Sequence, residues 1–136
     1  MIVPAGTTND VLLNELRACT ATQPSCSAAA SLNTRQIVYI SPRVFGTIPA
    51  RSAIGSNGQF YDPWQTPYNV RIDGDYNNST VNPYGAQAVG GAGADPVQQG
   101  VIAWSYGTDK LLGRNGDNVY KNPTTGAQSD DVISWQ

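Results

Sequence analysis

The sequence predicts an α+β fold in which an N-terminal helix packs on a small antiparallel β-sheet of three to four strands, followed by a long C-terminal loop. Two observations predict this class. Apolar residues recur at helical spacing only near the N-terminus, and the later apolar runs are short, rich in β-branched and aromatic residues, and interrupted by proline and glycine. Loops rather than crossover helices join these runs, which favours antiparallel pairing of consecutive strands.

The predicted helix begins at Asn9 or Asp10, because either residue can cap a first turn. We expect Pro24 to end it, and residues 27–32 to add another short helical turn. Residues 1–8 show no periodicity and are predicted to form a flexible start. The apolar residues at helical spacing are Val11, Leu12, Leu13, Leu16 and Ala18.

Three short runs are predicted to be strands. Residues 36–41 are β-branched and aromatic and stop at Pro42, a pattern typical of a buried strand. Apolar and polar side chains alternate along residues 68–73, and residues 100–105 form the third run. A short terminal segment, residues 130–135, is the candidate for a fourth strand.

We expect a single core in which the apolar helix residues pack on residues 37–40, 70–72 and 101–104. Two tryptophans, Trp64 and Trp135, are predicted to pack at the ends of the sheet. The remaining segments contain many glycine, proline and polar residues and are predicted loops: 43–60, 85–99 and 106–129.

Length and composition favour one domain, residues 1–136, and exclude several functions. The 8 basic and 10 acidic side chains include no basic stretch, which argues against nucleic-acid binding. Histidine is absent, so Ser-His-Asp catalysis is excluded. No apolar run reaches the length of about 18 residues that would span a membrane. We therefore expect a non-catalytic protein; a carboxylate pair acting in glycoside hydrolysis is the enzymatic alternative.

The two cysteines, Cys19 and Cys26, are separated by six residues that include Pro24. In an oxidising compartment such a short loop closes readily, so we predict a structural disulfide. Two free thiols are the alternative. A redox or metal pair is a third possibility, but the spacing is not C-x-x-C and no imidazole completes a site.

Two groups of acidic residues are candidates for metal binding. Residues 73–78 resemble the start of a calcium loop, but they lack its glycine at the sixth position and its glutamate at the twelfth. We therefore favour a turn held by side-chain bonds to the backbone. The second group lies in and after the long C-terminal loop and consists of Asp109, Asp117, Asp130 and Asp131. Calcium would collect these carboxylates; the alternative is that they are simply solvated.

Three motifs resemble the type II secretion pseudopilins, which belong to the type IV pilin-like family. Residues 62–68, Asp-Pro-Trp-Gln-Thr-Pro-Tyr, are similar to the D-P-W-G-x-P-Y segment of that family, with Gln65 in place of the usual glycine. Residues 102–109 resemble the family strand that ends in S-x-G-x-D. Residues 130–135 resemble the terminal D-D-I-x-S-W. The motifs occur in family order and cover roughly residues 60–136.

This resemblance implies a pilin-like fold and a calcium ion that holds the C-terminal loop against the sheet. The implied ligands are Asp109, Asp130 and Asp131 together with the backbone carbonyl of Tyr106. Asp117 is a further candidate, although the loop of residues 110–129 is longer than the usual family loop and Asp117 has no family counterpart in it.

The resemblance also implies a structural subunit of a pseudopilus or pilus-like filament, which associates with copies of itself and with other pseudopilins or pilins. Its expected location is extracytoplasmic, in the periplasm or at the cell surface, with anchoring in the inner membrane through an N-terminal apolar helix that this chain does not contain. The alternative function is an adhesive binding module, like a minor pilin, that contacts glycan or protein through loops 43–60 and 77–99.

Overall fold

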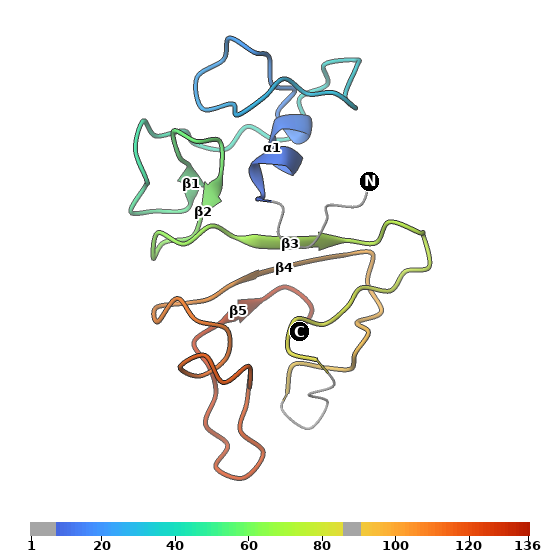
Figure 1. Ribbon diagram of the computed structural model, residues 1–136, viewed down its shortest axis with the longest axis vertical. Coiled ribbons are helices and arrows are strands. Elements are labelled where there is room, and N and C mark those ends of the chain that lie inside the picture. The colour runs from blue at the N-terminus through green and yellow to red at the C-terminus, as the bar shows by residue number, and fades with distance from the viewer. Residues whose placement is uncertain (1–7, 86–90) are drawn as a thin grey trace. The chain divides into compact units, whose positions relative to one another are not determined.

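A computed structural model gives the fold of residues 8–85 and 91–136 (Figure 1). The predicted flexible start therefore lies outside the described residues except for Thr8, and so does part of the predicted loop 85–99. The elements within the described ranges are α1 (Asp10–Leu16), β1 (Ala53–Ile54), β2 (Phe60–Tyr61), β3 (Asn69–Ile72), β4 (Val101–Ser105) and β5 (Val132–Ile133).

The predicted α+β fold, with an N-terminal helix packed on a sheet of three to four strands, is wrong. The described part of the chain is mostly β, with two small antiparallel sheets and one helix of 7 residues that does not pack on a sheet. The helix begins where predicted but ends well before Pro24. Ala18 adopts a φ of 52°, in the left-handed region, and the chain then enters the loop closed by Cys19.

The predicted buried strand at residues 36–41 is also wrong. The amides of Tyr39 and Ile40 both donate to the carbonyl oxygen of Leu16, at 2.9 and 3.2 Å, so this segment contacts the end of α1 instead of a neighbouring strand. Its side chains are exposed, with 57% of Val38 and 62% of Tyr39 accessible. Runs of β-branched residues form strands only where another strand edge is available to pair with them.

The chain divides into two compact units, which we call the N-terminal unit (through Tyr68) and the C-terminal unit (Asn69–Gln136). In the N-terminal unit β1 and β2 pair antiparallel, with Ala53 opposite Tyr61. The Asn9 side chain joins the start of α1 to β2, because it accepts from the Phe60 amide at 2.9 Å and donates to the Phe60 carbonyl at 2.8 Å. These short strands lie in or beside segment 43–60, which the sequence had predicted to be a loop.

The Asp-Pro-Trp segment of the N-terminal unit forms a tight turn. The Asp62 carboxylate is fully buried and accepts hydrogen bonds from the amides of Trp64 and Thr66, at 2.9 and 2.8 Å. Gln65 has a φ of 70°, in the left-handed region that glycine adopts at no steric cost. The turn therefore requires at Gln65 the conformation for which glycine is the best residue.

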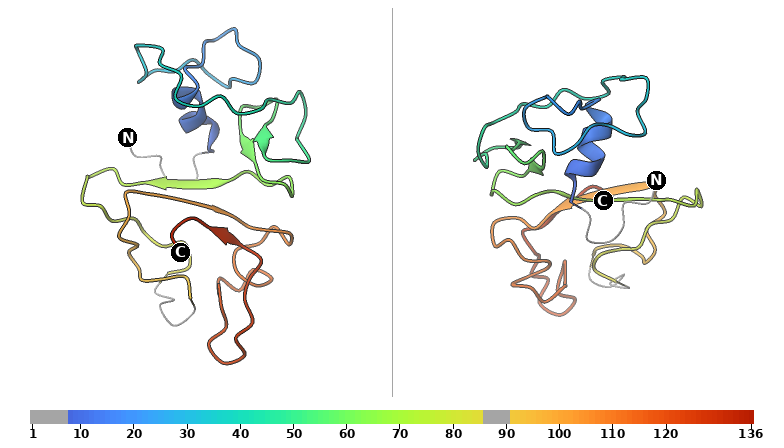
Figure 2. Two further views of the ribbon diagram at one scale, coloured as in Figure 1. Left: turned by 180° about the vertical axis from the view of Figure 1, so that it is seen from behind. Right: turned by 45° about the horizontal axis from the view of Figure 1, so that its top comes forward.

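The C-terminal unit is built on the three-stranded sheet β3-β4-β5, which stays together in the turned views of Figure 2. Asn69 lies opposite Trp104 in the β3–β4 pair, and Trp104 lies opposite Ile133 in the β4–β5 pair. The strands predicted at residues 68–73 and 100–105 are thus confirmed, and the terminal segment supplies the short third strand.

Aromatic residues form the core of the C-terminal unit. Trp135 packs against a cluster of Tyr84, Ala92 and Tyr120 and also against a cluster that contains Ile102 and Trp104. Its indole N–H donates to the carbonyl of Ala92 at 2.7 Å. Trp135 therefore lies between two parts of the core rather than at the end of the sheet.

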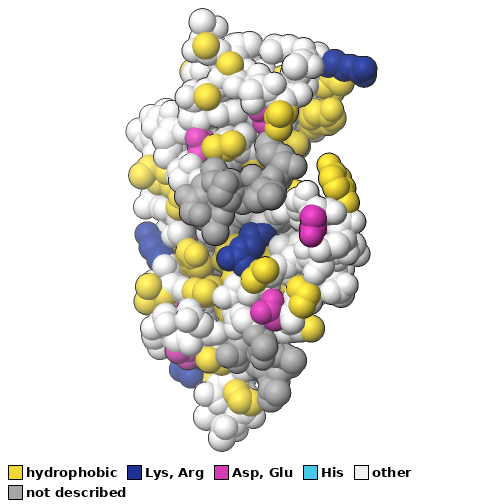
Figure 3. Space-filling view, turned by 45° about the vertical axis from the view of Figure 1, so that its right-hand side comes forward, with side chains coloured by type: hydrophobic (Ala, Val, Ile, Leu, Met, Phe, Trp, Pro, Cys, Tyr) yellow, Lys and Arg dark blue, Asp and Glu magenta, His cyan; other side chains and the backbone are white. Residues whose placement is uncertain are grey.

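The surface agrees with the low charge of the sequence. In the face shown in Figure 3, uncharged polar side chains and backbone predominate, and charged side chains lie singly between them. Cys19 and Cys26 form the predicted disulfide, with their Cα atoms 5.9 Å apart. Within residues 8–85 and 91–136, no helix is long and apolar enough to cross a membrane.

Candidate metal centre

Three aspartates from the two ends of the long loop between β4 and β5 come together in the C-terminal unit. One carboxylate oxygen each of Asp109, Asp130 and Asp131 lies within 4.8 Å of the others. Asp109 follows the end of β4, whereas Asp130 and Asp131 immediately precede β5. Since β4 and β5 are adjacent antiparallel strands, their connected ends lie side by side. The three carboxylates form an acidic cluster that can hold a metal ion.

Asp130 binds the first turn of the loop. Its Oδ2 accepts hydrogen bonds from the backbone amides of Thr108 and Asp109. Burial acts to raise the pKa of Asp130, and these amide bonds outweigh it, so the pKa lies below its usual value. Gly107 makes this approach possible, because a Cβ built there would lie 2.4 Å from the Asp130 carbonyl oxygen.

Asp131 is the buried member of the cluster, with 5% of the residue exposed. Its Oδ2 accepts hydrogen bonds from the Tyr84 hydroxyl at 2.5 Å and from the Gly113 amide at 2.7 Å. Its Oδ1 is buried and has no hydrogen-bond partner. Burial is the largest influence on this carboxyl and raises its pKa, and the negative charge of Asp109 acts in the same direction.

Asp109 holds the next part of the loop. Its Oδ1 accepts from the Leu111 amide at 2.9 Å, and its Oδ2 accepts from the Asn115 amide at 3.1 Å. The carboxylate therefore orders six residues of chain while remaining exposed to solvent. An exposed ligand of this kind leaves the cluster accessible to an ion from solution.

The cluster carries unbalanced negative charge. Two negative charges 4.8 Å apart, the largest separation of the ligand oxygens in this cluster, repel each other by about 1 to 3.5 kcal/mol for effective dielectric constants between those of water and a protein surface. Lys110 and Arg114 are nearby in sequence, but neither forms an ion pair within the described ranges. A bound cation would remove this repulsion and give the orphaned Oδ1 of Asp131 a partner.

The other two predicted ligands have different surroundings. The Asp117 carboxylate accepts from the amides of Arg114 and Val119, at 2.8 and 2.9 Å, and so closes its own turn. It is not one of the three clustered acids. The Tyr106 side chain packs against the core, and its hydroxyl lies 3.5 Å from Oδ1 of Asn69. Neither side chain takes part in the cluster. The ligand predicted at Tyr106 is its backbone carbonyl, which these side-chain contacts do not test and which stays a prediction.

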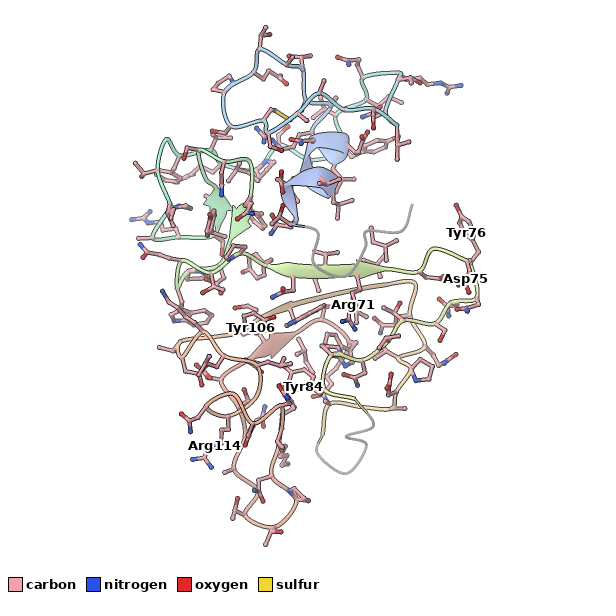
Figure 4. The ribbon with its side chains drawn as sticks, viewed as in Figure 1. Arg71, Asp75, Tyr76, Tyr84, Tyr106 and Arg114 are labelled. Atoms are coloured by element: carbon pink, nitrogen blue, oxygen red, sulfur yellow. A yellow bond between two sulfur atoms is a disulfide. The ribbon has the colours of Figure 1, made fainter. Side chains whose placement is uncertain are left out.

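Two residues that were not predicted from the sequence position the buried part of the centre: Tyr84, which is labelled in Figure 4, and Asn82. The Asn82 side-chain amide donates to the carbonyls of Ala92 and Ala94, at 2.9 and 3.1 Å, and its oxygen accepts from the Tyr84 amide at 3.0 Å. Asn82 thereby fixes the chain that carries Tyr84. No local pattern marks either residue, because apart from the bond between them, the partners named here are 10 to 47 positions away.

Comparison with protein-family models, curated proteins and solved structures finds no match to this chain.

Proposed function

We propose that this protein is a non-catalytic, extracytoplasmic structural subunit whose C-terminal unit binds Ca²⁺ through Asp109, Asp130 and Asp131. The observation that carries the calcium proposal is the buried, unpartnered Oδ1 of Asp131 beside two further carboxylates. A buried charged oxygen without a partner is costly, and a cation coordinated there would offset that cost.

The donor set favours calcium over other common ions. All side-chain donors are carboxylate oxygens, histidine is absent and both cysteines are in the disulfide, so the soft ligands typical of zinc sites are missing. Calcium binds oxygens at about 2.3–2.6 Å with flexible geometry, which suits donors within 4.8 Å of one another on an irregular loop. Magnesium requires near-ideal octahedral geometry and shorter bonds.

The proposed role as a subunit of a pseudopilus or pilus-like filament rests on the motifs at residues 62–68, 102–109 and 130–135. The composition is compatible with this role, because a subunit that packs against its own copies needs neutral polar surface more than reactive groups. The disulfide is consistent with an oxidising compartment outside the cytoplasm. The proposed partners are copies of this chain and related filament subunits.

Thermal unfolding with saturating calcium and with a chelator tests the calcium proposal. A ligand that binds only the folded protein raises its stability by mass action, by about 2.7 kcal/mol at 100 times the dissociation constant. We expect the midpoint of unfolding to rise with calcium in the wild type and not in Asp131→Ala. Asp117→Ala is the matched control, because its carboxylate belongs to the same loop but not to the cluster; it should keep the response. A wild-type midpoint that is equal with calcium and with chelator would contradict the proposal.

A further inference from the structure

We propose that two copies of this chain join through an aromatic side chain of one and a hollow in the other. Tyr76, at the turn after β3, inserts into the hollow formed by residues 32–39 of the N-terminal unit of a second copy. Asp75 beside Tyr76 then pairs with Arg35 in the wall of that hollow. This inference rests on the proposed function, because it takes the partner to be another subunit of the proposed filament.

Tyr76 is presented to solvent by a rigid turn. It is 88% exposed, an unusual position for a large aromatic residue, and Figure 4 shows it at the outer end of the turn with Asp75 beside it. The Asp73 carboxylate holds the turn by accepting from the amides of Tyr76 and Asn78, at 2.9 and 2.6 Å. These bonds agree with the predicted turn. Because the turn is already ordered, docking Tyr76 costs little conformational entropy.

The hollow has a volume of about 220 Å³ and is lined by Leu32, Asn33, Thr34, Arg35, Ile37 and Tyr39. Its apolar members are unusually exposed, with Leu32 at 63% and Tyr39 at 62%. An inserted aromatic ring would cover these side chains, and the polar lining can bind its hydroxyl. Tyrosine is well suited to such mixed surroundings because its ring is apolar and its end is polar.

The wall of the hollow is ordered before any partner arrives. The Glu15 carboxylate accepts hydrogen bonds from the amides of Ser31, Leu32 and Asn33, at 2.7 to 3.0 Å. The Asn33 side chain in turn accepts from the Ile37 amide and donates to the Ile37 carbonyl, at 3.0 and 2.7 Å. Both partners in the proposed contact are therefore pre-formed.

Charge complementarity supports a second copy as the occupant. The C-terminal unit contains seven of the ten acidic side chains but four of the eight basic ones, whereas the N-terminal unit has one more basic than acidic side chain. Arg35 is exposed and has no ion pair or hydrogen bond to the described residues. A tyrosine beside the Asp75 carboxylate thus meets a mostly polar hollow that contains a free guanidinium and exposed Leu32 and Tyr39 side chains. Such a contact joins different surfaces of the two copies, so repetition builds an open chain of subunits.

Sedimentation equilibrium of the full chain in calcium buffer tests the proposal. We expect reversible self-association of the wild type, weakened about tenfold or more by Tyr76→Ala and by Arg35→Asp. The double variant Arg35→Asp with Asp75→Arg should recover most of the lost association, because the two charges are exchanged. Arg51→Asp is the matched control, since Arg51 is an exposed arginine of the same unit outside the hollow, and it should associate as the wild type does.

Disulfide trapping identifies the occupant of the hollow. Mixing a Tyr76→Cys protein with a Leu32→Cys protein should give a disulfide-linked pair under oxidising conditions. A wild type that stays monomeric up to ~1 mM, or an Arg51→Asp variant weakened as much as Arg35→Asp, would overturn the proposal. So would an internal disulfide in the Tyr76→Cys, Leu32→Cys double variant with no trapping between copies. A wild type that does not self-associate but is stabilised by calcium rejects this inference alone. A wild type that self-associates but is not stabilised by calcium rejects the calcium proposal alone.

Discussion

The hydroxyl of Tyr84 donates a 2.5 Å hydrogen bond to Oδ2 of Asp131, 47 positions further along the chain. Both residues are buried, with 3% and 5% exposed. Burial and the adjacent carboxylate raise the pKa of Tyr84 far above its ordinary value, so the hydroxyl stays protonated and continues to donate. The bond uses Oδ2 and leaves Oδ1 for a different partner. Tyr84 thus orients Asp131 in the candidate metal centre.

Tyr84→Phe should lower both stability and calcium affinity. Removing a buried donor to a charged acceptor costs about 1.5–3 kcal/mol of unfolding free energy. Groups that orient metal ligands typically contribute about 10- to 100-fold in affinity. Urea unfolding and calcium titration measure the two effects. Tyr120→Phe is the control, because among the described residues that hydroxyl accepts only from the Gln128 side chain, at 3.1 Å. Equal affinities in the two variants would show that Tyr84 does not orient the ligand.

Gly107→Ala should disrupt the centre through its backbone. Gly107 has a φ of 65°, and an added Cβ would collide with the Asp130 backbone at 2.4 Å. We expect a loss of about 3 kcal/mol or more and a large loss of calcium affinity, because Asp130 must move. Gly126→Ala separates the effect of the positive φ from the effect of the collision. Gly126 has a φ of 70°, but a Cβ added there would meet no atom within 4 Å. That variant should lose only about 1 kcal/mol and bind calcium normally. Equal affinities in both variants would contradict this account.

Gln65→Gly should stabilise the N-terminal unit or leave its stability unchanged. Gln65 has a φ of 70°, which costs a residue with a side chain about 1 kcal/mol more than glycine. The greater flexibility of glycine in the unfolded chain offsets part of this gain. Urea unfolding of the variant and the wild type measures the change in unfolding free energy. A loss of more than about 1 kcal/mol would mean that the Gln65 side chain makes a contribution the turn geometry does not explain.

The contribution of Glu15 to stability should depend on pH. Burial acts to raise the pKa of Glu15, but its hydrogen bonds from Ser31, Leu32 and Asn33 outweigh burial and lower the pKa below 4.5. Since the folded protein favours the ionised carboxylate, the contribution is complete above pH 4.5 and is lost as the pH falls through the lowered pKa.

Glu15→Gln should therefore lower the free energy of unfolding at pH 7 by about 1 kcal/mol, a modest amount because the carboxylate is close to solvent. The difference from the wild type should shrink as the pH falls below 4.5 and through the lowered pKa of Glu15, because the carboxyl then becomes protonated in the native state as well. Urea unfolding at a series of pH values measures it. A difference that stays constant across the series would rule out the charge of Glu15 as its cause.

Part of the fold could be predicted from the sequence because its signals are local. The alternation along residues 68–73 and the β-branched run at 100–105 each predicted a strand, and both strands pair as expected. Residues 36–41 carry a similar signal, but a strand also needs a neighbouring edge, which local pattern does not reveal. The two-residue strands β1 and β2 are too short to show periodicity.

Part of the candidate metal centre could also be predicted from the sequence. Asp109, Asp130 and Asp131 were named from their positions beside strand ends, and the structure brings these three together. The same reasoning placed Asp117 among the ligands, because sequence does not tell whether a carboxylate in a glycine-rich loop closes its own turn. Tyr84 could not be predicted, since its contact with Asp131 depends on the packing of the whole unit.

Isothermal titration of calcium into the chelator-treated protein tests the central claim most directly. We predict that the wild type binds one calcium ion per chain and that Asp117→Asn binds it with the same stoichiometry and a similar affinity. Asp131→Asn loses the buried charged ligand, so we predict a calcium affinity at least about 100-fold weaker for this variant. The absence of binding heat in a folded wild type at several temperatures, or equal affinities in the two variants, would contradict the assignment of calcium to Asp109, Asp130 and Asp131.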